Sequence, residues 1–204
     1  MFVTLNFLDR NATPISNRGK KIIQKLNTLF ITALFGSIIF VVNAFLPPPI
    51  NYILIVVQAV LLAVSGLFVK KVGATYAGAV GGLLTALISP ALGPFTFLFA
   101  LLFGILVDGS MFLFRINATY EGVNRNRLMV AIAVSTMLIG IISYSAFAVF
   151  PQFVPFAKNL GVGLFIQRSI MLDAMVLFMG PVTGVVAGYA ASYLWNKYLR
   201  YIHV

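Results

Sequence analysis

Two carboxylates lie inside long apolar stretches of this chain and are its first candidates for chemistry. Asp108 lies in the segment Gly93–Phe114, and Asp173 lies near the start of the segment Ile170–Leu194. An ionisable side chain is costly in a membrane interior, so each is a functional hypothesis by default. Two aspartates could share a proton as in an aspartyl protease, but their carboxyls must then be about 3 Å apart. Asp108 and Asp173 lie at different depths along their segments, which argues against such a pair.

Each aspartate also has a structural explanation. Asp173 suits the first turn of a helix, where the helix dipole favours negative charge, and Arg168 is close enough in sequence to pair with it. Direct contact with a ligand is the alternative for Asp173. For Asp108 the expected partners are Arg115, another basic residue of the inner loops, or backbone groups opened by Gly104 and Gly109. We therefore expect a structural or coupling role for Asp108 rather than substrate chemistry.

Several kinds of catalytic site are excluded by residue content. The sequence has no cysteine and a single histidine, His203. Thiolate nucleophiles are therefore impossible, and neither a histidine-based metal cluster nor a Ser–His relay can be built from this chain alone. A phosphate-binding loop ending in Gly-Lys-Ser/Thr is also missing from the sequence. We expect no metal, no cofactor and no enzymatic activity.

Polar and aromatic residues gather at positions expected in the outer half of a membrane. Amide groups and aromatic walls would suit a small planar ligand with polar edges. An ordinary aromatic belt at the membrane surface is the open alternative. The substrate-binding residues predicted on this basis are Asn43, Asn51, Tyr52, Gln58, Phe95, Tyr144, Gln167 and Asp173.

The composition of the chain determines what must position these residues. Of 204 residues, 61% are hydrophobic and 9% are charged, and the mean hydropathy is +1.02. An average soluble domain has roughly 25% charged residues, so this chain has too few polar side chains to cover a water-facing surface. The sequence therefore predicts an all-α, polytopic membrane helical bundle with no sizeable soluble domain.

Prolines and basic residues divide the apolar part into about six segments. Segments of this length cross a hydrocarbon core of roughly 30 Å at about 1.5 Å per residue. They are approximately Asn27–Leu46, Ile50–Val69, Val72–Ser89, Gly93–Phe114, Leu128–Phe150 and Ile170–Leu194. The expected organisation is a basic N-terminal segment (1–26), a transmembrane domain (27–196) and a C-terminal tail (197–204).

The basic residues predict the orientation of the bundle. The formal net charge is +10, and most basic residues fall in the N-terminal segment, in alternate loops and in the C-terminal tail. The positive-inside rule then puts both termini in the cytoplasm of a cell-membrane protein that contacts anionic lipid. In a soluble protein such a charge would suggest nucleic acid. No groove of alternating basic and aromatic residues lies outside the apolar segments, so we expect no nucleic-acid partner.

Small residues recur four positions apart in several segments. Such faces let helices approach closely. Packing inside the bundle is the default interpretation, and a docking face for another membrane subunit is the alternative. The small residues are Ala33 and Ser37 in the first segment, Gly73, Ala77 and Gly81 in the third, and Gly180, Gly184 and Gly188 in the sixth.

Parts of the sequence between about Pro47 and Arg115 resemble a known family. The stretches GATYAGAVGG (73–82), LISPALGP (87–94) and FGILVD (103–108) look like the substrate-binding S-component of energy-coupling-factor (ECF) vitamin transporters. They are most similar to the thiamine-precursor (hydroxymethylpyrimidine) branch. That branch has a small-residue third helix, a Gly-Pro loop and an acidic residue late in the fourth helix.

The resemblance implies a six-helix bundle that captures a micronutrient from outside. It also implies a transmembrane coupling subunit and two ATPase subunits, which would hydrolyse the ATP. S-components dock through small residues of their first helix, a part that Ala33 and Ser37 could play, although Ser stands where Ala is more usual.

Two other functions are compatible with the sequence. The chain could be an accessory or scaffold subunit of a larger membrane complex, with no ligand of its own. It could also be an autonomous secondary transporter, although no clear proton relay or inverted repeat supports this.

Overall fold

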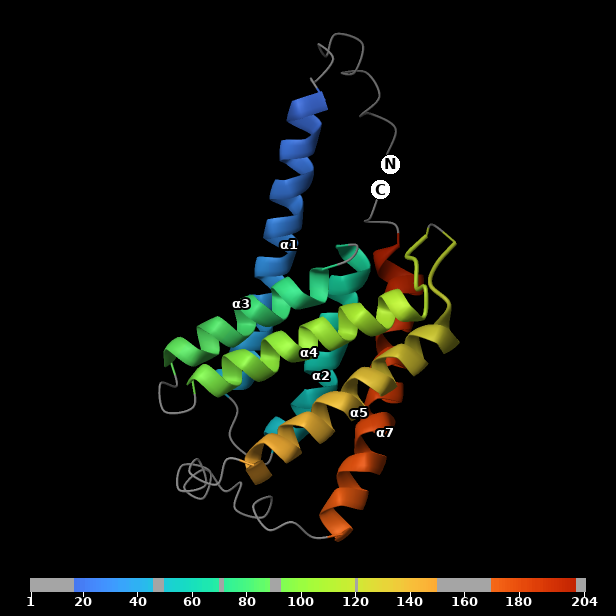
Figure 1. The fold of residues 1–204 in the computed structure, drawn as a ribbon. Coiled ribbons are helices and arrows are strands. Elements are labelled where there is room, and N and C mark those ends of the chain that lie inside the picture. The colour runs from blue at the N-terminus through green and yellow to red at the C-terminus, as the bar shows by residue number, and fades with distance from the viewer. Residues whose placement is uncertain are drawn as a thin grey trace.

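The computed structural model describes residues 17–45, 50–69, 72–88, 93–119, 121–149 and 170–200. This part of the chain is helical, apart from one isolated bridge between Thr119 and Gly122, which confirms the all-α prediction. Its helices are α1 (Asn17–Phe45), α2 (Ile50–Phe68), α3 (Gly73–Ile88), α4 (Gly93–Leu113), α5 (Arg125–Val149), α7 (Ile170–Leu194) and the π-helical turn η3 (Trp195–Leu199) (Figure 1).

Three of the described helices are long and apolar enough to cross a membrane. Their spans are Phe95–Leu113, Arg125–Ser143 and Leu177–Leu199, and α1, α2 and α3 carry shorter apolar stretches. Large apolar side chains also point outward, among them Phe112, which is 82% exposed, and Phe30, which is 71% exposed. Lipid, rather than water, accommodates such a surface. The bundle therefore has the surface of a membrane protein.

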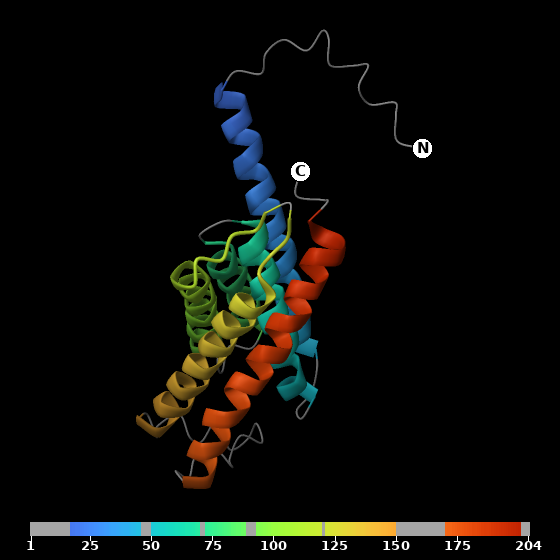
Figure 2. The same ribbon diagram turned by 90° about the vertical axis from the view of Figure 1, so that its right-hand side faces the viewer.

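The helices form two crossing layers, and α2 has a central position in them. Figures 1 and 2 show α3, α4 and α5 lying across α1, α2 and α7. α2 contacts each of the other long helices, and its residues 62–67 are all buried. A helix that is apolar on every side belongs in the centre of a bundle, which explains the position of α2.

An aromatic cluster fixes the end of α7 to α2. Trp195, at the start of η3, is fully buried. Its ring lies edge-on to Phe68 at the end of α2, with centroids 5.0 Å apart, and Phe68 also lies 6.1 Å from Phe35 of α1. Such aromatic pairs add specific geometry to apolar burial. The cluster joins three helices at the end of the bundle where α4 connects to α5.

α1 begins earlier than the apolar pattern predicts. The apolar segment starts near Asn27, whereas the helix starts at Asn17, inside the basic segment 1–26. Lys, Arg and Gln are good helix formers, so the helix continues through residues that are too polar for a membrane interior. Figure 1 shows this part of α1 projecting beyond the other helices.

Candidate functional site

Most side chains of the predicted substrate pocket lie outside the described residues. These are the side chains of Asn43, Asn51, Tyr52, Tyr144, Asp173 and Gln167. All of these except Gln167 belong to helix ends at one end of the bundle. The C-terminal ends of α1 and α5 and the N-terminal ends of α2 and α7 lie there (Figure 1). The described side chains of the set, Gln58 in α2 and Phe95 in α4, are half-buried. The substrate-binding assignments stay predictions.

Asp108 of α4 caps the start of α3. One carboxylate oxygen accepts the backbone N–H of Ala74 at 3.1 Å. The other accepts both the backbone N–H and the hydroxyl of Thr75, each at 2.7 Å. The first N–H groups of a helix have no partner within the helix, and the helix dipole favours a negative charge there. A cap normally comes from the residue before the helix, and here another helix supplies it.

The expected pairing of Asp108 with Arg115 does not occur among the described residues. Arg115 is exposed beyond the end of α4, whereas the Asp108 carboxylate points to α3. Backbone groups are the partners, as one of the alternatives predicted, but they belong to Ala74 and Thr75 of α3 rather than to the turns around Gly104 and Gly109.

α2 closes the remaining side of this junction. A Cβ added to Gly66 would lie 3.1 Å from the Asp108 carboxylate and 3.0 Å from the sulfur of Met111. The hydroxyl of Ser65 donates to the carbonyl of Gly73 at 2.9 Å. Because α2, α3 and α4 meet here through hydrogen bonds and backbone contacts, the Asp108 carboxylate serves the fold in this conformation.

The glycines of α3 lie against its neighbours on two faces. A Cβ on Gly78 would meet the carbonyl oxygen of Ala100 in α4, and one on Gly82 would lie 2.8 Å from the Ala100 Cβ. On the other face, a Cβ on Gly81 would lie 2.8 Å from Ile39 of α1. The small residues of α3 therefore let two helices approach its backbone.

α7 uses its small residues in the same way, against α5. A Cβ on Gly180 would lie 3.0 Å from the Cα of Met137, and one on Gly188 would lie 2.7 Å from the Cα of Met129. Between them Gly184 faces the side chain of Thr136, whose hydroxyl donates to the carbonyl of Gly180 at 2.7 Å. This face is an internal contact of the bundle.

α1 differs, because its predicted docking pair faces outward. Gly36 is buried against α3, where an added Cβ would lie 2.7 Å from Val80. Ala33 and Ser37 are exposed, and the Ser37 hydroxyl donates to the carbonyl of Ala33 at 2.8 Å. The Ser37 hydroxyl is thus satisfied within its own helix. The pair forms a strip of small side chains on the surface of α1, and Leu34 and Ile38 beside it are also exposed.

A polar hollow that the sequence patterns did not predict lies at the connection between α4 and α5. Its lining combines arginine and asparagine side chains, Arg115, Asn117, Asn124 and Arg127, with one acid, Glu121. The density of Arg and Asn between two apolar segments is the signal that could have revealed it. It lies at the end of the bundle opposite to the predicted substrate pocket.

Comparisons of the chain with models of protein families, with curated proteins and with solved structures find no match.

Proposed function

We propose that this chain is a membrane-embedded substrate-binding subunit for uptake of a small micronutrient, in the manner of an ECF S-component. The ligand, a vitamin or a precursor such as one related to thiamine, would bind at the end of the bundle where α1, α2, α5 and α7 meet. A transmembrane coupling subunit and two ATPase subunits would drive its release on the other side. The chain itself would catalyse no reaction.

The observation that carries this proposal is the outward face of α1. Among the described residues, no other helix covers Ala33 and Ser37, which are exposed, whereas the neighbouring Gly36 is buried against α3. A small-residue strip on a lipid-facing helix allows a second membrane helix to approach closely. This is the part that the resemblance assigns to the first helix of an S-component.

The packing of α3 agrees with a subunit that moves as one body. Its glycines hold α1 and α4 at short range, and Asp108 ties its first turn to α4. Close-packed contacts of this kind resist internal deformation. A partner that pulls on α1 would therefore tilt the whole bundle rather than separate its helices.

The distribution of charge supports a cell-membrane location with both termini in the cytoplasm. Arg125, Arg127 and Lys197 lie at the end of the bundle that also carries the C-terminal end of α7. Basic residues of membrane proteins are enriched on the cytoplasmic side. The predicted substrate pocket would then open outward.

The proposal is tested by ligand binding to the purified full chain. Thiamine, hydroxymethylpyrimidine, riboflavin and biotin are added separately in detergent, and the unfolding temperature is measured. A ligand at about 100 times its Kd stabilises the folded state by about 2.7 kcal/mol. Gln58→Ala should weaken binding of the active ligand about tenfold, because the proposed hydrogen bond from this half-buried side chain to the ligand would be lost. Gly109→Ala, in open space on α4, serves as the control and should bind normally.

Absence of any shift, together with recovery of the chain in fixed ratio within a large complex, would refute the proposal. It would instead favour an accessory subunit without a ligand of its own.

A further inference from the structure

An apolar groove runs beside the contact between α5 and α7. Its volume is about 410 Å³, and its lining extends from Asn126 to Met137 on α5 and includes Pro181 and Val185 of α7. Among the described residues that line it, every side chain except Asn126 is apolar. The groove therefore has one polar end, at the start of α5, and is otherwise suited to a hydrocarbon ligand.

The length of the groove matches one leaflet of a membrane. Asn126 and Met137 are about 16 Å apart along the helix axis, at about 1.5 Å per residue. A hydrocarbon core is about 30 Å thick, so the groove has the depth of roughly half of it. A partner helix would contact α5 and α7 across both leaflets, whereas an acyl chain starts at the headgroups and occupies one. The dimensions favour an acyl chain.

A cation lies beyond the polar end of the groove. The guanidinium carbon of Arg125 is 3.9 Å from the centroid of the Tyr189 ring, so this side chain crosses from α5 to α7. Arg125 is four residues before Met129, and Tyr189 is four residues after Val185. Met129 and Val185 both line the groove. Because residues four apart share a helix face, the contact between Arg125 and Tyr189 lies one turn beyond the groove on both helices.

The start of α5 favours an anion at the same place. Arg125 and Asn126 are the first two residues of α5, and both are exposed. The first N–H groups of a helix have no acceptor within the helix, and the helix dipole is positive there. A guanidinium group can bind phosphate through its N–H donors while its flat face stays on an aromatic ring. A phospholipid carries its phosphate where its acyl chains begin, which is the arrangement of this cation and the groove.

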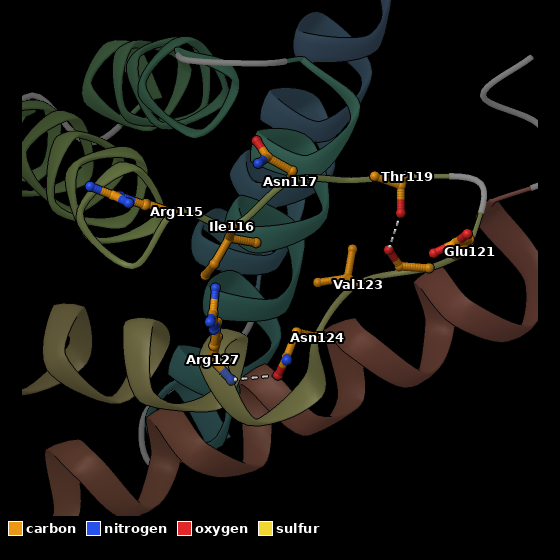
Figure 3. A pocket seen from close by; sticks show the side chains of 9 residues that line it. Arg115, Ile116, Asn117, Thr119, Glu121, Val123, Asn124 and Arg127 are labelled. Carbon is orange, nitrogen blue, oxygen red and sulfur yellow. Dashed lines mark hydrogen bonds between the residues drawn. The ribbon is translucent and has the colours of Figure 1, made fainter.

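Arg127, two residues later, has different surroundings. Figure 3 shows its side chain directed toward Ile116, in the polar hollow between α4 and α5. Arg127 lines that hollow and does not line the groove. It carries the same charge as Arg125 on the same turn of α5, so it provides a matched control.

We propose that the groove between α5 and α7 binds one acyl chain of an anionic phospholipid, whose phosphate lies at Arg125 and Asn126. The lipid belongs to the leaflet that surrounds the N-terminal end of α5. The inference is independent of the uptake function proposed above, because it involves neither the predicted substrate pocket nor the strip of Ala33 and Ser37.

Native mass spectrometry of the full chain in detergent tests the inference. Bound lipid is counted after addition of phosphatidylglycerol or phosphatidylcholine with identical acyl chains. Arg125→Gln should lower the affinity for phosphatidylglycerol at least about tenfold, because charge-assisted hydrogen bonds to phosphate are lost. The loss for phosphatidylcholine, whose net charge is zero, should be smaller. Arg127→Gln removes the same charge from outside the groove and should change either affinity less than about twofold, since exposed charges are screened.

The groove is tested separately by a pair of tryptophan variants. Val130 lines the groove and is 48% exposed, so Val130→Trp fills the groove without entering the core. It should weaken both lipids at least about tenfold, because several methylene groups lose their apolar contacts. Val186→Trp makes the same substitution at a 52% exposed position of α7 that does not line the groove, and it should bind both lipids normally. Val130→Trp leaves Arg125 in place, so it tests the site even if Arg125→Gln destabilises the bundle.

Equal losses for Arg125→Gln and Arg127→Gln would overturn the inference, because the attraction would then depend only on net charge. Equal losses for the two tryptophan variants would overturn it as well, because the acyl chain would then lie elsewhere. Recovery of the wild-type chain as a lipid-free dimer that Val130→Trp dissociates would assign the groove to a second copy instead. Selective losses in Arg125→Gln and Val130→Trp, with both controls unchanged, would support the inference.

Discussion

Small residues four positions apart occur in α1 and in α3, but the two helices use them in opposite directions. The glycines of α3 face inward and hold α1 and α4 against its backbone. Ala33 and Ser37 of α1 face outward, where the bundle places nothing against them among the described residues. One sequence pattern thus marks an internal contact in one helix and an available surface in the other. The difference is one of helix position, because α3 has neighbours on two faces and α1 is peripheral.

The largest expected effect on stability comes from removing the Asp108 carboxylate, which caps α3. Asp108→Ala deletes the carboxylate bonded to Ala74 and Thr75 and leaves backbone N–H groups of α3 without their acceptor. We expect a loss of about 3 kcal/mol of unfolding free energy, measured by thermal and denaturant unfolding in detergent. Glu121→Ala, which removes an exposed acid, should cost less than about 0.5 kcal/mol. Equal losses of unfolding free energy in the two variants would mean that the hydrogen bonds of Asp108 to α3 do not stabilise the bundle.

A pair of identical substitutions tests the inward face directly. Gly78→Ala places a methyl group against the carbonyl oxygen of Ala100, so α3 and α4 must separate. We expect a loss of about 2 kcal/mol. Gly109→Ala meets nothing within 4 Å and should stabilise α4 by up to about 1 kcal/mol, because glycine is a poor helix former. The two changes in unfolding temperature should have opposite signs, and the same sign would contradict the packing described here.

The contact between α5 and α7 offers a test of intermediate size. Thr136→Val removes a hydrogen bond between helices, to the carbonyl of Gly180. The expected loss is about 1 kcal/mol, typical of hydrogen bonds between transmembrane helices. Thr183→Val removes a bond to the same carbonyl from within α7, so it should have almost no effect. A greater loss for Thr183→Val would place the stabilisation within α7 rather than between helices.

The smallest effect on stability is expected on the outward face. Ala33→Leu adds bulk to an exposed position and should change the unfolding free energy by less than about 0.5 kcal/mol. Under the proposed function it should nevertheless abolish recovery of the coupling and ATPase subunits with the chain, as measured by affinity purification from membranes. Leu34→Ala, at an exposed position beside the strip, is the control and should retain the partners. Normal recovery with Ala33→Leu would remove this face from the docking surface.

The apolar pattern predicted the helices well where breakers were strong. The predicted segment Ile170–Leu194 coincides with α7, and Gly93–Phe114 ends one residue beyond α4. At α1 the pattern failed by ten residues, from Asn27 to Asn17, because hydropathy marks the hydrocarbon layer whereas helix propensity continues into the basic stretch.

The candidate site was less predictable from sequence. Asp108 stood out as a polar residue in an apolar segment, yet its partners Ala74 and Thr75 lie 34 and 33 positions earlier in the chain. Backbone N–H groups occur at every residue except proline, so no residue type marks which of them a carboxylate will cap. The hollow between α4 and α5 was likewise not predicted, because its shape depends on the left-handed turn at Arg115 and on the distant amide of Asn196.

The sequence by itself determined that lipid surrounds the helices and where most of them lie, because apolar content and segment length are properties of each segment taken alone. It also determined that thiol chemistry is absent, since no cysteine is available. Only the tertiary structure decided which small residues face a neighbour and which face outward, and which backbone groups receive the Asp108 carboxylate. Those outcomes depend on which helices become neighbours, and a pattern within a single segment carries no information about its neighbours.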